Sequence, residues 1–194
     1  MDAGMAKPDL ASHRHRLLSS VQERVLEIGF GTGANLPYYP KRVKSLVAID
    51  VNPGMSPLAK RRIKEYGRQV DHRILDVEKL PFSDGEFDSV VSSWTLCSVK
   101  DTQRALEEIH RVLNPLGCFF FLEHGLSPDS RVQRWQYRLN RLNRMVACGC
   151  ELIRPIPKNV ERAGFIIDSL EEFYIPKIPS THGYMYQGVA RKKR

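Results

Sequence analysis

Short apolar runs alternate along the chain with longer stretches in which apolar residues recur at helical spacing. Continuous apolar runs such as 46–49 and 118–122 are typical of strands buried on both faces. The pattern predicts strands at 25–28, 46–49, 70–75, 87–92, 118–122, 165–167 and 184–190. Helices are predicted at 10–21, 34–39, 52–66, 101–113 and 127–146. Alternation of strand and helix indicates an α/β fold with a mostly parallel sheet and helices on both faces.

Local signals set the ends of these elements. Asn52-Pro53 is predicted to open a helix, because Asn caps helices and Pro suits the first turn, and Gly67 is predicted to end it. Asp101 and Ser127-Pro128 are predicted to start two later helices. Ligands of parallel sheets bind beyond the carboxyl ends of the strands. The residues that follow each strand are therefore the candidate site residues.

The first predicted strand runs into a turn, 29–33, with glycine at every second position. Glycine permits a positive φ and lets a ligand approach bare backbone, and a following helix start suits a nucleotide or a carboxylate. Gly29, Gly31 and Ala34 satisfy the dinucleotide fingerprint Gly-x-Gly-x-x-Gly/Ala. Glu27 and Gly33 also complete the pattern acid-x-Gly-x-Gly-x-Gly. A purely structural turn is the third interpretation.

Length, charge and cysteine usage narrow the class of protein. The 194 residues fit one domain, predicted to span 1–194. The chain has no apolar run of membrane-spanning length and no signal-peptide core, so we expect a cytoplasmic protein. Its four cysteines form no Cys-x-x-Cys pair, and no metal site is expected. The net charge of +8 favours an anionic partner without naming it.

Two further segments bear on the ligand. Residues 80–91 (LPFSDGEFDSVV) and 105–117 (ALEEIHRVLNPLG), taken with the acid-glycine turn, resemble motifs of the class I S-adenosylmethionine (SAM) methyltransferases that act on small molecules. The resemblance implies a Rossmann-like, doubly wound, mostly parallel seven-stranded sheet. It also implies SAM as cofactor and S-adenosylhomocysteine (SAH) as product.

A narrower resemblance is carried by 94–99 (WTLCSV), 123–125 (EHG), 149–154 (GCELIR) and 184–190 (YMYQGVA). These segments are similar to a subgroup that contains the methyltransferase-like thiol S-methyltransferases and their bacterial relatives. Leu116 departs from that pattern, because it stands where the family usually has Gly, and we expect a less permissive turn there. Glu151 stands where relatives often carry His, which suggests a different substrate preference.

The resemblance implies a set of cofactor-binding residues at the strand ends. They are Glu27, Gly29, Phe30, Gly31, Gly33, Asp50, Val51, Asp76, Val77, Trp94 and Thr95. Glu27 is expected to help hold the amino end of SAM, and Asp50 to accept both ribose hydroxyls. Asp76 is expected near the adenine amine. The alternatives are structural: a strand-end acid, a helix cap and a solvated turn residue, respectively.

The acceptor side rests on fewer signals. His124 follows the fifth strand and is the candidate catalytic base, with a structural histidine as the equal alternative. Tyr38, Trp135 and Arg154 are predicted to shape the substrate pocket. Helical residues from about 127 to 160 are expected to contribute a cap over it.

The helix predicted at 132–146 carries two neighbouring stripes. One is apolar (Val132, Trp135, Leu139, Leu142 and Val146) and the other is basic (Arg131, Arg134, Arg138, Arg141 and Arg144). A docked helix with a solvated basic face is the favoured interpretation. Peripheral contact with an anionic membrane through 131–144 is the alternative.

The sequence therefore predicts methyl transfer from SAM to a small, hydrophobic acceptor: a thiol, a phenol or quinol, or an amine. An NAD(P)-dependent oxidoreductase with the same turn is the first alternative, although no Tyr-x-x-x-Lys pair is present. A basic nucleic-acid-binding module is the second. No nucleic-acid motif supports it, so a nucleic-acid partner is not expected.

Overall fold

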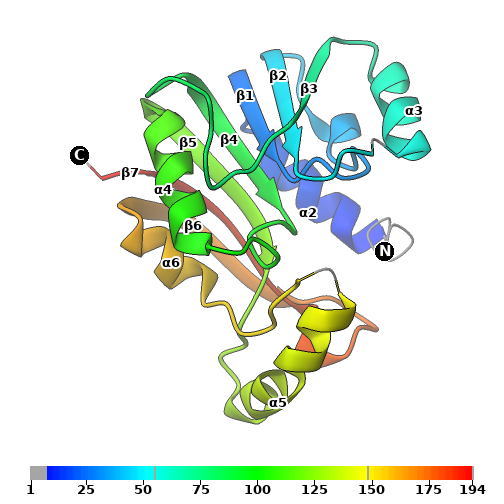
Figure 1. The fold of residues 1–194 in the computed structure, drawn as a ribbon, viewed down its shortest axis with the longest axis vertical. Coiled ribbons are helices and arrows are strands. Elements are labelled where there is room, and N and C mark those ends of the chain that lie inside the picture. Colours follow the sequence, from blue (N-terminus) through cyan, green and yellow to red (C-terminus); the bar gives the residue numbers. More distant parts are fainter. Residues whose placement is uncertain (1–7, 55, 148, 194) are drawn as a thin grey trace.

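The computed structural model describes residues 8–54, 56–147 and 149–193. One seven-stranded sheet has the order β3-β2-β1-β4-β5-β7-β6 (Figure 1). Its strands are β1 (Glu23–Ile28), β2 (Val43–Asp50), β3 (Val70–Ile74), β4 (Phe87–Ser93), β5 (Leu113–His124), β6 (Phe165–Tyr174) and β7 (Tyr184–Lys192). The first five strands are parallel, and β7 runs antiparallel between β5 and β6. The doubly wound, mostly parallel seven-stranded fold is confirmed.

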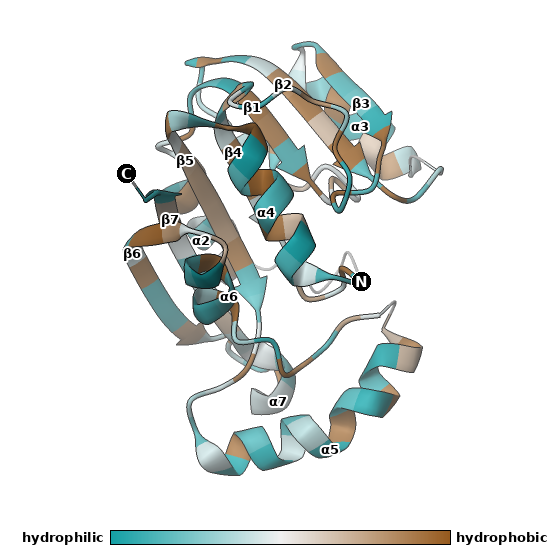
Figure 2. Ribbon diagram, turned by 60° about the vertical axis from the view of Figure 1, so that its left-hand side comes forward, coloured by the Kyte–Doolittle hydropathy of each residue, from teal (hydrophilic) through white to brown (hydrophobic). Residues whose placement is uncertain are grey.

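Helices cover both faces of this sheet. The helical segments of the described residues are α2 (Pro8–Leu18), the 3₁₀ turn η1 (Leu36–Tyr38), α3 (Pro57–Tyr66), α4 (Thr102–Val112), α5 (Ser130–Val146), α6 (Ile156–Arg162) and α7 (Ser180–Gly183). One apolar core layer contains α4 and α6, and the other contains α2, η1 and α3. Helix α5 lies apart from the sheet beyond the carboxyl end of β5, beside α7 (Figures 1 and 2). No helix in the described ranges has the length and apolar character to cross a bilayer.

The strand pattern explains why both layers form. In β1, Leu26 and Ile28 pack into the α4 layer, whereas Val25 packs into the α2 layer, because successive side chains of a strand point to opposite faces. The apolar run of β5 is a brown stretch in Figure 2, as expected for a strand buried on both faces. Because the first five strands run parallel, their carboxyl ends lie together at one edge of the sheet.

Two predicted helix starts are wrong for the same reason. Asn52 does not cap α3: its side-chain oxygen accepts from the Gly54 N–H in a local turn, and Ser56 caps the helix by accepting from Ala59 N–H at 3.0 Å. Helix α5 begins at Ser130, with Asp129 as its cap, instead of at Ser127-Pro128. Asn, Asp and Ser form turns as readily as caps. The Asp101 cap and the Gly67 stop are confirmed.

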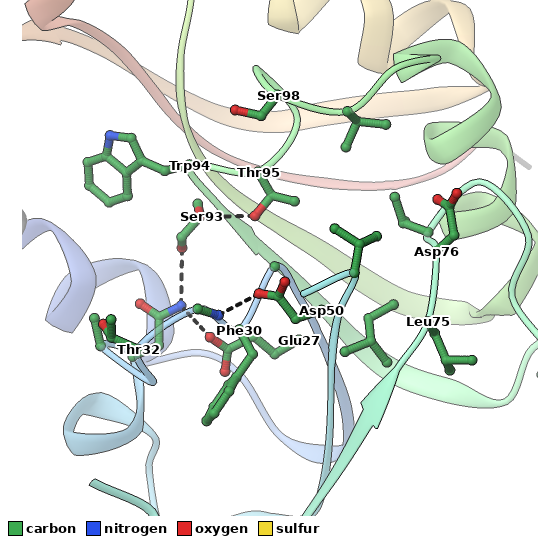
Figure 3. Close-up of a pocket in the computed structure, with 18 of the residues that line it drawn as sticks. Glu27, Phe30, Thr32, Asp50, Leu75, Asp76, Ser93, Trp94, Thr95 and Ser98 are labelled. Atoms are coloured by element: carbon green, nitrogen blue, oxygen red, sulfur yellow. Dashed lines mark hydrogen bonds between the residues drawn. The ribbon is translucent and has the colours of Figure 1, made fainter. Parts of the chain in front are cut away.

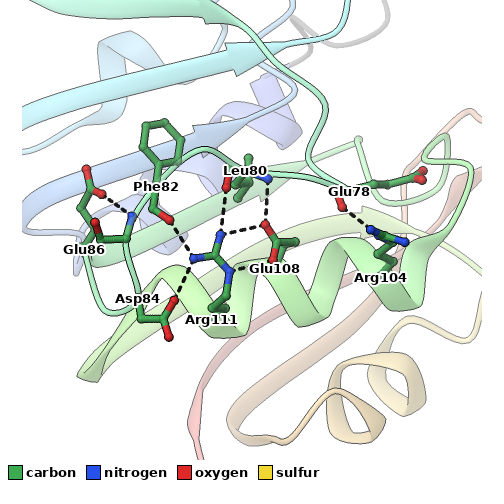
Figure 4. Close-up of polar contacts among 9 residues, drawn as sticks. Glu78, Leu80, Phe82, Asp84, Glu86, Arg104, Glu108 and Arg111 are labelled. Carbon is green, nitrogen blue, oxygen red and sulfur yellow. Dashed lines mark hydrogen bonds and ion pairs between the residues drawn. The ribbon is translucent and has the colours of Figure 1, made fainter.

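The signature segments 80–91 and 105–117 meet in one polar clamp (Figure 4). The Arg111 guanidinium donates to the Leu80 and Phe82 carbonyls at 2.9 and 2.7 Å and to the Glu108 carboxylate. Glu108 in turn accepts from Leu80 N–H at 2.7 Å. The clamp therefore fixes the loop between β3 and β4 onto α4. Leu116 lies within β5 at 79% exposure and outside the positive-φ region, so its position requires no glycine.

Candidate active site

A cavity of about 470 Å³ opens at the carboxyl ends of β1, β2 and β4 (Figure 3). The predicted cofactor residues that line it are Glu27, Gly29, Phe30, Gly31, Asp50, Val51, Asp76, Val77, Trp94 and Thr95. Gly33 does not line the cavity. It has a φ of +70°, and a Cβ there would meet the Phe30 ring at 3.0 Å, so its observed contribution is to the packing of the turn.

The glycine turn brings β1 against the loop that follows β4. Gly29 has a φ of +68°, and a Cβ there would lie 1.8 Å from Thr95 Oγ1. The absence of a side chain at Gly29 lets Thr95 approach β1, where its hydroxyl donates to the Ile28 carbonyl at 3.1 Å. Gly31 differs, because a Cβ there would meet nothing closer than 3.8 Å and would project into open space. Gly29 is required for the fold of the turn, whereas Gly31 leaves room beside the cavity.

Two acids line the cavity at strand ends and also hold their own loops. Asp50 accepts from Gly31 N–H at 2.8 Å and from Asn52 N–H at 2.9 Å, with one bond to each carboxylate oxygen. Each oxygen retains further acceptor capacity. Asp76 accepts from Glu78 N–H at 2.9 Å in a local turn. The structural and ligand-facing interpretations of both acids are therefore compatible.

Glu27 is a buried acid at the cavity wall. Its carboxylate accepts from Asn35 Nδ2 at 3.0 Å and from the Tyr39 hydroxyl at 2.9 Å. Burial nevertheless raises the pKa of Glu27 to about 7, against the lowering effects of these bonds and of the Arg14 charge. A cation placed beside Glu27 would favour its ionised form. Arg14, Asn35 and Tyr39 are site-supporting residues that sequence reasoning missed.

Trp94 has an uncommon backbone conformation. Its φ is +53°, a region that costs energy for residues other than glycine and that concentrates at functional sites. Its N–H donates to the Leu122 carbonyl at 2.9 Å, and the Arg14 guanidinium lies 4.8 Å from its ring centroid. The strained residue thus turns the chain from β4 into the loop that lines the cavity.

Glu123, at the end of β5, organises that loop from beneath. Its buried carboxylate accepts from the Ser92 hydroxyl at 2.5 Å and from Thr95 N–H at 3.0 Å. The N–H groups of Leu96 and Cys97 also lower its pKa, but burial prevails and raises it to about 7. Glu123 therefore positions Thr95 while remaining outside the cavity lining.

The predicted acceptor residues are not gathered in this cavity. His124 is only 4% exposed, and its Nδ1 faces Cys150 Sγ at 3.9 Å. Arg154 donates from Nη2 to the carbonyl of cavity-lining Val99 at 2.5 Å and pairs with Glu151 at 3.5 Å. Tyr38 packs partly buried beside the α2 layer. The catalytic and substrate-pocket assignments of these side chains stay predictions.

Helix α5 is docked by polar side chains. Buried Gln136 accepts from Ser127 N–H and donates to the Gly125 carbonyl, and buried Asn143 donates to the Cys150 carbonyl. The predicted apolar stripe is therefore not the face that packs against the rest of the protein. Three of its residues, Trp135, Leu142 and Val146, are 54%, 59% and 73% exposed. Amide side chains suit this face because the adjoining loops present backbone N–H and C=O groups that need hydrogen-bond partners.

A sheet of this order, with a glycine turn after β1 and acids after β2 and β3 around one cavity, defines a nucleotide-type cofactor site of the methyltransferase class. The family model "Methyltransferase domain" matches residues 26–121. The human thiol S-methyltransferase TMT1A is 34% identical over 181 residues, which are 86% of this chain and 73% of that protein. The chain belongs to the class I SAM-dependent methyltransferase family.

Other comparisons find related sequences and folds. The demethylmenaquinone methyltransferase of Clavibacter sepedonicus is 30% identical over 149 residues, 77% of this chain and 58% of that protein. The crystal structure of the Bacillus YcgJ protein matches with a TM-score of 0.72 and 16% identity, covering 95% of this chain and 100% of the other. The methyltransferase CalH, crystallised with SAH, matches with a TM-score of 0.62 and 24% identity, covering 99% and 62%. These two structures show the shared fold.

Proposed function

We propose that this protein transfers the methyl group of SAM to a small, hydrophobic thiol. The use of SAM as cofactor is supported by the cavity itself, because ten of the strand-end residues expected from the SAM motifs line it. The fit is chemical as well as spatial, because the cavity offers a carboxylate at Glu27, another at Asp50 and apolar walls at Val51 and Val77.

The cavity-lining groups suit the parts of SAM in order along the sheet edge. Glu27 would attract the α-ammonium group, and Asp50 would accept the ribose hydroxyls with the acceptor capacity left on its oxygens. Val51, Val77 and Asp76 would surround the adenine. Trp94 and Thr95, on the loop after β4, would border the sulfonium end.

SAM supplies an already activated methyl group, so the protein has little covalent chemistry to perform. Its contribution is to hold acceptor and donor in line and to exclude water. The rigid loop after β4 supports this role, since it is tied to Glu123, Ile28 and Arg154 by hydrogen bonds. A thiol acceptor would react as its thiolate.

The thiol assignment is supported by the subgroup segments and by the thiol S-methyltransferase relative. The quinone-pathway relative supports a quinol as the second candidate acceptor. Transfer of labelled methyl from SAM should be measured with matched panels of alkyl and aryl thiols, phenols, quinols and amines. We expect turnover of thiols, rising with their apolar character. Turnover restricted to quinols or amines would contradict the thiol assignment and leave methyl transfer intact.

We further infer that the exposed face of α5 contacts an anionic membrane. No acid lies between Ser130 and Val146, and Arg131, Arg134, Arg138, Arg141 and Arg144 are all exposed. Trp135, Leu142, Met145 and Val146 are exposed beside them, at 54–77%. Aromatic and aliphatic side chains interleaved with Arg are typical of helices that lie in a membrane interface. Such contact would place the enzyme where apolar acceptors concentrate.

A further inference from the structure

Three potential metal ligands from distant parts of the chain meet beneath the loop after β4. Cys97 lies in that loop, His124 ends β5, and Cys150 follows α5. One ligand atom from each lies within 4.8 Å of the other two. Cys97 and His124 are 3% and 4% exposed, and Cys150 is half-buried. We call these three residues the Cys97–His124–Cys150 cluster.

Hydrogen bonds fix the backbone around the cluster. Glu151 N–H donates to the Cys97 carbonyl at 2.8 Å, and Asn143 Nδ2 donates to the Cys150 carbonyl at 2.8 Å. His124 is held in the ladder between β5 and β7, opposite Met185. The three side chains are therefore brought together by the fold itself, since these contacts hold the backbone segments that carry them.

The polar groups of the cluster are incompletely satisfied. His124 turns its Nδ1 toward Cys150 Sγ at 3.9 Å, so a metal ion in the cluster would bind Nδ1. Its Nε2 is buried without a hydrogen-bond partner in the described chain and would not be a ligand of that ion. Each of the two cysteines offers one sulfur to the shared space, and the ligand atoms of all three residues lie within 4.8 Å of one another. Thiolate is the form of cysteine that binds metals.

We propose that Cys97, His124 and Cys150 form a binding site for one zinc ion. Two sulfur ligands and one imidazole suit zinc, and they exclude the oxygen-preferring Mg²⁺ and Ca²⁺. Zinc bonds of about 2.3 Å to sulfur and about 2.0 Å to nitrogen place tetrahedral ligand atoms about 3.5–3.8 Å apart. Separations of up to 4.8 Å therefore need to contract by about 1.3 Å at most. Three protein ligands leave a fourth position for water or an added thiol.

The proposal is tested by metal binding, independently of methyl transfer. The reduced, chelator-treated full chain should be titrated with Co²⁺, whose thiolate charge-transfer absorption reports sulfur ligation, and then with Zn²⁺. We expect one equivalent of Co²⁺, displaced by Zn²⁺. Cys97→Ser and Cys150→Ser should each weaken Co²⁺ binding at least tenfold and lose charge-transfer intensity, and His124→Ala should weaken binding while keeping the sulfur band.

Two matched controls make the result specific. Cys118→Ser replaces a cysteine elsewhere on β5, and Cys148→Ser replaces one that lies outside the described residues; both should bind Co²⁺ as the native chain does. Far-UV circular dichroism checks that every variant is folded. Absence of a thiolate–Co²⁺ band in the folded, reduced native chain would overturn the proposal. Loss of binding in Cys148→Ser with retention in Cys150→Ser would overturn the ligand assignment. A Cys97–Cys150 disulfide in the protein as isolated, without Co²⁺ binding after reduction, would identify a redox pair instead.

Discussion

At the scale of single residues, the site depends on acids whose environments differ. Glu27 is buried and its pKa is raised to about 7, whereas Asp50 is partly exposed and hydrogen-bonded to two backbone N–H groups. The sequence located both, because acids that end strands of a parallel sheet converge on one edge. It did not reveal the partners of Glu27, since Arg14, Asn35 and Tyr39 carry no pattern that distinguishes them from ordinary helix and turn residues.

SAM affinity should rise about tenfold between pH 6 and pH 8 if Glu27 holds the α-ammonium group. Below its raised pKa of about 7, Glu27 is mostly protonated, so binding of the ammonium group must first release that proton. Above this pKa the carboxylate is already ionised and can pair with the ammonium group directly. Calorimetry should show this slope for SAM and a flat profile for 5′-methylthioadenosine, which lacks the amino-acid part. Glu27→Gln should remove the slope; an unchanged slope in that variant would assign the titration to another group.

Asp50→Ala should weaken SAH binding by about 1–3 kcal/mol, because ribose hydroxyls lose a charged acceptor. Asp50→Asn separates charge from loop support, since its amide oxygen can still accept from Gly31 N–H. Asp71→Ala is the matched control: it removes an acid from β3 that pairs with Arg73 and does not line the cavity. Equal affinity in the native chain and both Asp50 variants would restrict Asp50 to a structural role.

Gly31→Val should abolish SAH binding in a folded protein. Gly31 lines the cavity, and an added side chain there would occupy space that no protein atom fills and that the ligand needs. The positive φ adds about 1–2 kcal/mol of strain. Gly67→Val is the control for strain alone, since Gly67 has a φ of +66° at the end of α3 and lies outside the cavity. Gly29→Ala should instead unfold the turn against Thr95. Native affinity in folded Gly31→Val would exclude this turn from the site.

At the scale of elements, the strands were predictable and the helices less so. Buried parallel strands are apolar throughout, so their runs stand out, whereas the edge strand β6 was predicted only to 167 because its later residues are mostly exposed. Helix α6 was missed, since its seven residues offer only two buried apolar positions. Periodicity also misidentified the docked face of α5, because apolar spacing cannot reveal a helix held by Gln136 and Asn143.

The exposed face of α5 leads to a prediction for the helix as a unit. The triple variant Arg131→Gln, Arg138→Gln, Arg141→Gln should lower partitioning onto phosphatidylserine-containing vesicles about a hundredfold, at about 1 kcal/mol for each Arg near an anionic surface. A triple variant with the same charge change, Lys60→Gln, Lys64→Gln, Lys79→Gln, alters exposed residues elsewhere. Cosedimentation should distinguish them. Equal loss in both would indicate a net-charge effect, and no native binding would refute the membrane contact.

At the scale of the whole molecule, the fold class and the cofactor edge followed from the sequence, whereas the acceptor side did not. The predicted cofactor residues lie one after another at strand ends, so chain order gives their places. The predicted acceptor residues Trp135 and Arg154 belong to α5 and to 149–154, whose packing on the loop after β4 chain order does not give. The clearest example is Cys97, His124 and Cys150, which are separated by stretches of chain that match no ligand-spacing motif and yet lie within 4.8 Å. Only the packed structure brings them together.

Ligand-induced stabilisation of the whole domain should separate the three predicted classes of ligand. A ligand that binds only the folded state stabilises it by about 2.7 kcal/mol at a hundred times its dissociation constant. For a domain of this size, that corresponds to a rise in melting temperature of about 5–10 °C. Scanning calorimetry should show this rise with SAH and none with NAD or a short oligonucleotide. The Asp50→Ala protein, compared at the same SAH concentration, should rise by less, since its dissociation constant is higher. A rise with NAD alone would favour the oxidoreductase alternative over SAM chemistry at this cavity.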